Sequence, residues 1–97
     1  KLYSYQETNP YAWLKLGHEA FQGGNVGEAI RHYQKVIDMA PYLDEGYFGL
    51  AKSYYQKGAV DDAANAMQKA VETAYKEKTR HLYYAKLAIL QGKEADK

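Results

Sequence analysis

Apolar residues recur along this chain at the spacing of one face of an α-helix. In the first such stretch, small or apolar residues follow the i, i+3, i+4, i+7 pattern at Trp13, Leu16, Gly17 and Ala20. A second stripe follows at Val26, Ala29, Ile30, Tyr33, Val36 and Ile37. Both stretches alternate with polar residues on the opposite face, so the pattern predicts two consecutive amphipathic helices.

The residues that flank these stripes predict where the two helices begin and end. Asn9 is a favourable N-cap, and Pro10 suits the first helical position, where its missing N–H would have no partner. Gly24 can adopt the left-handed conformation that follows a helix C-terminus. We expect Asn25 to cap the second helix and Pro41 to end it.

Three further helices are predicted, over residues 44–57, from about 60 to 74 and from about 78 to 91. Asp44 opens the first of them, and Gly58 turns the chain into the next. Tyr75 stands where Pro41 stands one period earlier, so the fourth helix lacks a proline at its end. The sequence therefore also allows the fourth and fifth helices to fuse and to exchange the fifth helix between chains.

The chain repeats with a period of 34 residues, which separates Gly24, Gly58 and Gly92. The same register aligns Trp13 with Tyr47 and His81. A fixed period of this length predicts a solenoid, in which each unit buries its apolar face against the next. Small residues recur in this register too, and we expect paired helices to cross closely where Gly17 meets Ala29 and Ala51 meets Ala63.

Residues 10–41 resemble a tetratricopeptide repeat, whose pattern is W-x₂-L-G-x₂-Y, then A-x₃-F, then P. The chain has Trp13-x₂-Leu16-Gly17-x₂-Ala20, then Ala29-x₃-Tyr33, then Pro41. A second copy has Tyr47-x₂-Leu50-Ala51-x₂-Tyr54 and Ala63-x₃-Met67, and a third keeps only the first half, from His81 to Ala88. The resemblance implies an all-α, right-handed α-solenoid of antiparallel helix pairs with five helices. Its segments are an N-terminal tail or remnant (1–9), repeat 1 (10–43), repeat 2 (44–77) and a half repeat (78–97).

The first helix of each repeat carries a second set of positions, about a quarter-turn from the core stripe. These positions form an apolar–basic–apolar series that recurs every 34 residues: Leu14, His18 and Phe21; Phe48, Lys52 and Tyr55; Leu82, Lys86 and Ile89. Lys15, Gly49 and Tyr83 flank them. In the tetratricopeptide resemblance these positions line the concave groove that binds partner peptides. The alternative is that they only contact neighbouring helices or lie exposed without a partner.

The charge of these groove positions favours one kind of partner. Lys52, Lys86 and, when protonated, His18 lie between apolar residues, which suits an acidic and partly apolar peptide or protein segment. Some members of the family clamp the C-terminal carboxylate of chaperones with lysine, asparagine and arginine. The matching positions here are Leu14, His18, Gly49, Thr79 and Tyr83, so that clamp is not implied.

The fifth helix suggests a second class of function. Residues 82–90 are apolar on almost every side, whereas the end of a solenoid normally has a polar outer face. We expect cover from outside this chain, either from a second copy or from a following helix of a longer parent protein. The alternative function is therefore a structural element that oligomerises through this helix.

Composition and candidate chemistry argue against an enzyme. The chain has no cysteine, a net charge of +1 and no apolar run near the roughly 20 residues of a membrane span. None of His18, His32 and His81 has a partner at metal-ligand spacing, and Asp61 and Asp62 suit a helix N-terminus. We expect no metal, no cofactor, no nucleic-acid partner and no membrane contact by this segment. Nothing in the sequence assigns a cell compartment. The chain begins at Lys1 without methionine, as a fragment or processed product would.

Overall fold

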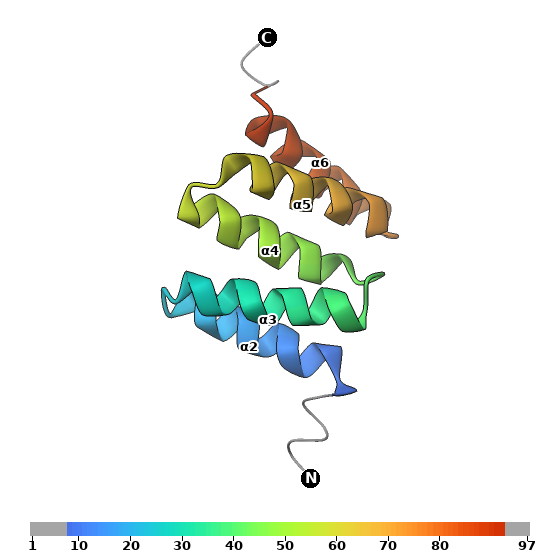
Figure 1. The fold of residues 1–97 in the computed structure, drawn as a ribbon. Coiled ribbons are helices and arrows are strands. Elements are labelled where there is room, and N and C mark those ends of the chain that lie inside the picture. Colours follow the sequence, from blue (N-terminus) through green and yellow to red (C-terminus); the bar gives the residue numbers. More distant parts are fainter. Residues whose placement is uncertain (1–7, 93–97) are drawn as a thin grey trace.

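The computed structural model of the chain describes residues 8–92, which form a series of α-helices (Figure 1). These helices are α2 (Pro10–Gln22), α3 (Val26–Met39), α4 (Asp44–Lys57), α5 (Val60–Thr73) and α6 (Glu77–Leu90). The bounds of α4, α5 and α6 lie within one residue of the ranges predicted from the sequence, which are 44–57, 60–74 and 78–91. Most of the predicted N-terminal segment 1–9, and residues 93–97 of the half repeat, lie outside the described residues.

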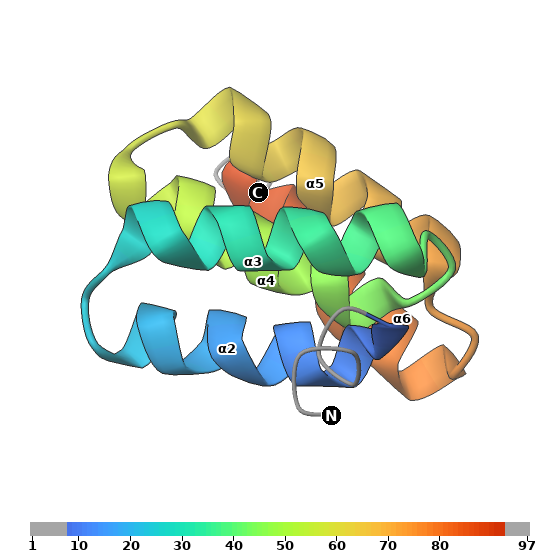
Figure 2. The ribbon, with the colours of Figure 1, turned by 60° about the horizontal axis from the view of Figure 1, so that its bottom comes forward.

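The helices stack in chain order, each antiparallel to the one before (Figure 1). Each helix packs against the next, and α2 also contacts α4. Seen from the α2 end, α3 and α5 lie together on one side of the array while α2 lies on the other (Figure 2). For residues 8–92, the prediction of an all-α array of five helices in antiparallel pairs is confirmed.

The alternative in which the fourth and fifth helices fuse is not adopted. Helix α5 ends at Thr73, and Ala74 takes an extended conformation with φ −69° and ψ 120°. The Arg80 guanidinium then donates hydrogen bonds from Nε and Nη2 to the Ala74 carbonyl oxygen, at 3.2 and 3.0 Å. This side chain satisfies a carbonyl at the helix end, so the turn forms without the proline that ends α3.

The turn residues match the sequence prediction at the glycines but not at every cap. Gly24, Gly58 and Gly92 have φ values of 81°, 90° and 74°, in the region that favours glycine. The Asn9 side chain accepts a hydrogen bond from the Tyr11 N–H at 2.9 Å, as expected of an N-cap. Asn25 also precedes a helix, but its side chain accepts no capping hydrogen bond. The prediction of a side-chain cap there is wrong.

The core centres on Tyr33 of α3, whose side chain is completely buried. Its ring lies against Gly17 of α2, where an added Cβ would come within 2.7 Å of Tyr33 Cε1, and it also lies against Gly49 of α4. The atoms nearest to that added Cβ at Gly17 belong to Tyr33, whereas the sequence pattern predicts a close crossing against Ala29. The wider core cluster joins all the helices through Leu14, Val36, Leu50, Met67, Val71, Tyr83 and Leu87.

Candidate functional site

Phe48 of α4 lies at the centre of the predicted groove positions. Its ring centroid is 4.9 Å from that of Tyr83 on α6, with the two planes tilted by 32°. The Lys52 Nζ lies 5.0 Å from the Phe48 ring centroid and 5.2 Å from the Phe21 ring centroid on α2. The structure thus brings Phe21 of α2, Phe48 and Lys52 of α4 and Tyr83 of α6 together, and we call the surface around them the groove.

A second lysine approaches the same aromatic ring. The Lys86 Nζ of α6 lies 6.0 Å from the Phe48 ring centroid. Both ammonium groups are at distances where the ring's negative face attracts a cation. Burial and the neighbouring charge of Lys86 lower the pKa of Lys52 below its usual value. The two cations therefore repel each other in a partly desolvated setting.

Neither lysine is neutralised by a carboxylate in the part of the chain that the structure describes. The ion pairs found between residues 8 and 92 involve Lys15, Arg31 and His32 only. Partial burial makes a lysine charge more costly when no anion lies beside it. Within residues 8–92, the positive charge of the groove is therefore not compensated by an ion pair.

Beside the lysines, the groove opens into a cavity of about 250 Å³ between α4, α5 and α6. Five predicted groove residues line it, namely Phe48, Lys52, Tyr55, Lys86 and Ile89. Sequence reasoning missed three others, which are Ala51, Met67 and Leu90. Met67 belongs to α5, and it reaches the cavity beside the small Ala51 side chain. The sequence signal that could have indicated this lining was the recurrence of small residues at Gly17 and Ala51, because a small side chain leaves space beside it.

The other predicted groove residues lie around or beneath this surface. Leu14 is buried in the core, and Tyr83 is buried with its hydroxyl donating to Asp44 Oδ2 at 2.5 Å. Lys15 is exposed and pairs with Glu19 at 4.0 Å, while Leu82 is exposed on α6. Leu14 and Tyr83 therefore pack beneath the groove surface, whereas Lys15 and Leu82 are exposed outside the groove.

His18 faces the N-terminal part of the groove. Its Nδ1 lies 2.6 Å from the Tyr33 hydroxyl, and its ring meets the Tyr33 ring edge-on at 5.5 Å between centroids. Burial lowers the pKa of His18, the positive charge of Lys52 lowers it further, and Glu45 opposes the shift. The lowered pKa favours the neutral imidazole, so the two lysines supply the positive charge of the groove.

The described residues offer no group suited to catalysis by a metal. Between residues 8 and 92 there is no cluster of three or more His, Cys, Asp or Glu side chains that could hold a metal ion. None of the helices in that range has the length and apolar character needed to cross a bilayer. The groove presents apolar side chains beside the ammonium groups of Lys52 and Lys86.

Comparison with known proteins agrees with this geometry. The family model for the tetratricopeptide repeat matches residues 14–79 and 48–96. A TPR repeat-containing protein of Methanocaldococcus jannaschii is 34% identical over 65 residues, which is 67% of this chain and 12% of that protein. The TPR repeat-containing protein YpiA of Bacillus subtilis is 26% identical over 91 residues, or 94% of this chain and 22% of that protein.

The chain thus spans less than a quarter of the length of either relative. Domains of this kind generally bind other proteins and are typically non-catalytic. The 34-residue period, the antiparallel helix pairs and the family match over residues 14–96 all agree. The chain therefore belongs to the tetratricopeptide repeat family.

Proposed function

We propose that the groove binds an acidic, partly apolar segment of a partner protein. The observation that carries this proposal is the pair of lysines Lys52 and Lys86, which share the Phe48 ring beside an apolar cavity and form no ion pair within residues 8–92. A carboxylate placed between the two ammonium groups relieves their mutual repulsion and gains two charge-assisted hydrogen bonds.

The cavity beside the lysines suits the apolar part of the same segment. Met67, Ile89 and Leu90 line it, and Tyr55 forms an exposed aromatic edge. An aliphatic or aromatic side chain of the partner, one or two residues from its carboxylate, would fill this space. The groove is small, so we expect dissociation constants on the order of micromolar.

The first prediction concerns charge reversal in the groove. A dodecapeptide array would select peptides that bind the wild-type chain, and fluorescence anisotropy would measure their affinity. We expect the selected peptides to combine Asp or Glu with apolar residues. Lys52→Glu combined with Lys86→Glu should weaken binding at least about tenfold, because the carboxylate then faces like charge.

The matched control is Lys35→Glu combined with Lys69→Glu. It changes the net charge equally, and the Lys35 Nζ also lies over an aromatic ring, 5.7 Å from that of Trp13. This control should bind the peptides as the wild type does. Equal losses in both double variants, or selected peptides without acidic residues, would contradict the proposal.

A second candidate function is self-association through α6. Leu82 and Ile89 share one face of α6 and are 55% and 54% exposed, while Tyr84, which is 59% exposed, lies on the opposite face. Contiguous exposed apolar surface on a soluble protein often marks an interface. Leu87, which sequence reasoning counted in this apolar run, is instead buried in the core. Its substitution would test folding rather than association.

The second prediction therefore uses exposed positions only. If α6 is an interface, sedimentation velocity should show a species that grows with protein concentration. Leu82→Gln combined with Ile89→Gln, on one face of α6, should shift this distribution toward the monomer. Tyr42→Gln, at another highly exposed tyrosine, should leave it unchanged. A wild-type chain that stays monomeric at high concentration would rule out this second function.

A further inference from the structure

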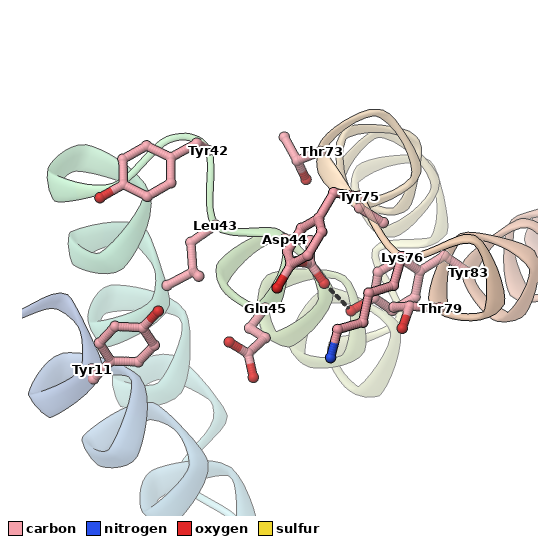
Figure 3. Close-up of a pocket in the computed structure, with 11 residues that line it drawn as sticks. Tyr11, Tyr42, Leu43, Asp44, Glu45, Thr73, Tyr75, Lys76, Thr79 and Tyr83 are labelled. Carbon is pink, nitrogen blue, oxygen red and sulfur yellow. Dashed lines mark hydrogen bonds between the residues drawn. The ribbon is translucent and has the colours of Figure 1, made fainter.

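A larger cavity, of about 720 Å³, lies at the end of the array where the α3–α4 and α5–α6 turns meet (Figure 3). It shares no lining residue with the groove cavity. We call it the turn cleft and describe it by six of its lining residues: Tyr11, Tyr42, Asp44, Glu45, Tyr75 and Lys76. Tyr83, whose ring packs against Phe48 of the groove, lies at the border between the two cavities.

Three tyrosines form the walls of the turn cleft. Tyr11, Tyr42 and Tyr75 are 58%, 72% and 80% exposed, and they come from the start of α2 and from the two turns. In Figure 3, Tyr11 and Tyr42 lie at the left of the cleft, while the Tyr75 ring lies in the middle of the view, where it overlaps Asp44. Exposed ring faces that line a cavity are suited to stacking a flat or cationic group.

Two carboxylates lie between these walls, in the first turn of α4. Asp44 accepts the hydrogen bond of the Tyr83 hydroxyl, while Glu45 is exposed and has no ion pair within residues 8–92. Burial raises the pKa of Tyr83 most strongly, and the hydrogen bond to Asp44 and the charges of Asp44 and Glu45 raise it further. The turn cleft therefore has a negative local potential.

One cation of the chain, the Lys76 ammonium group, already lies in the turn cleft. The Lys76 Nζ lies 6.0 Å from the ring centroid of its neighbour Tyr75. It forms no ion pair with Asp44 or Glu45 in the described part of the chain. The carboxylate of Glu45 thus remains available, and Lys76 is the single like charge that an incoming cation would meet among the lining residues.

We propose that the turn cleft binds an arginine side chain of a partner protein. A guanidinium group is planar, so it can stack on a tyrosine ring while its fork of N–H groups donates to the Glu45 carboxylate. It is also less strongly hydrated than an ammonium group, which favours arginine over lysine in a cleft walled by aromatic rings. The remaining volume admits the backbone on either side of the arginine.

The test uses the peptide acetyl-Gly-Arg-Gly-amide and the full chain, titrated by nuclear magnetic resonance at low salt. We expect the signals of Tyr42, Tyr75 and Glu45 to shift with saturation. Glu45→Gln should weaken binding about fivefold, because it removes the charge partner of the guanidinium. Lys76→Gln should instead strengthen binding, because it removes the resident like charge. General electrostatic attraction would give changes of the same two signs, so control variants are needed to locate the site.

Matched controls separate the cleft from general electrostatic attraction. Asp62→Asn removes a carboxylate from the first turn of α5, and Tyr84→Ala removes an exposed tyrosine from α6, so neither should change binding. A citrulline peptide of the same shape but without charge should not bind. Equal binding by the citrulline or the lysine version, or shifts that centre on Asp62, would overturn the proposal. Circular dichroism checks that each variant stays folded.

Discussion

Tyr33→Ala should destabilise this chain by about 3–5 kcal/mol. The Tyr33 side chain is completely buried, and its ring fills the space beside Gly17 and Gly49, where neither neighbour has a side chain that could collapse into the gap. Small domains are stable by only about 5–15 kcal/mol, so the loss removes a large part of the total. Urea unfolding followed by circular dichroism measures it.

Tyr33→Phe is the control that keeps the ring and removes the hydroxyl. It loses the hydrogen bond to His18 Nδ1, which should cost about 0.5–1.5 kcal/mol. A Tyr33→Phe variant that is destabilised as strongly as Tyr33→Ala would contradict the packing argument, because the hydroxyl would then matter more than the ring.

The wild type and Tyr33→Phe should also differ in how their stability depends on pH. Burial raises the pKa of Tyr33 to about 12, whereas a tyrosine in an unfolded chain titrates near 10. Between these values the unfolded chain releases the Tyr33 proton and the folded chain keeps it. The stability that Tyr33 contributes is therefore fully present below pH 10 and falls as the pH rises toward 12. Tyr33→Phe should lose less stability than the wild type over this range.

The sequence was sufficient to predict the helices because their signals are local. Asn9 and Pro10 mark the start of α2, and the glycines at positions 24, 58 and 92 mark turns whose backbone has positive φ. The break between α5 and α6 was harder to predict. It depends on the Arg80 guanidinium reaching back to the Ala74 carbonyl, and no residue type in the turn itself signals that contact.

The groove was predictable in part because it is built from a repeat. Phe48, Lys52 and Lys86 meet because equivalent positions of stacked helices face the same side. Leu14 belongs to the same set by spacing, yet the structure buries it, while Trp13 is only partly buried. Adjacent residues differ by about 100° around a helix, so a modest rotation of α2 decides which of them faces the core. That rotation is set by contacts with other helices.

The turn cleft was not predicted because its residues come from distant parts of the chain. Tyr11, Tyr42 and Tyr75 belong to three elements, and in sequence Tyr75 was notable only for the proline that it replaces. Asp44 and Glu45 have an ordinary local role as acidic residues in the first turn of a helix. Only the stacking of the repeats places the tyrosines and the carboxylates around one cavity.

Gly49→Ala should destabilise the chain by about 1–3 kcal/mol, although alanine favours helix formation more than glycine does. A Cβ at Gly49 would overlap the Tyr33 ring, and that ring cannot move away because Gly17 of α2 lies against it as well. Gly17→Ala should cost a similar amount, since its Cβ would lie 2.7 Å from Tyr33 Cε1. Chemical denaturation of the two variants and the wild type measures both changes.

Gly27→Ala is the matched control, and it should have the opposite sign. Gly27 also lies within a helix, α3, but an added Cβ there meets no atom within 4 Å. Alanine at this position should therefore stabilise the chain by up to about 1 kcal/mol through helix propensity alone. If the contact with Tyr33 determines the effect, combining Gly49→Ala with Tyr33→Ala should cost less than the sum of the two changes. If the losses of stability in the two single variants add up to that of the double variant, the alanine at position 49 does not act through its contact with Tyr33.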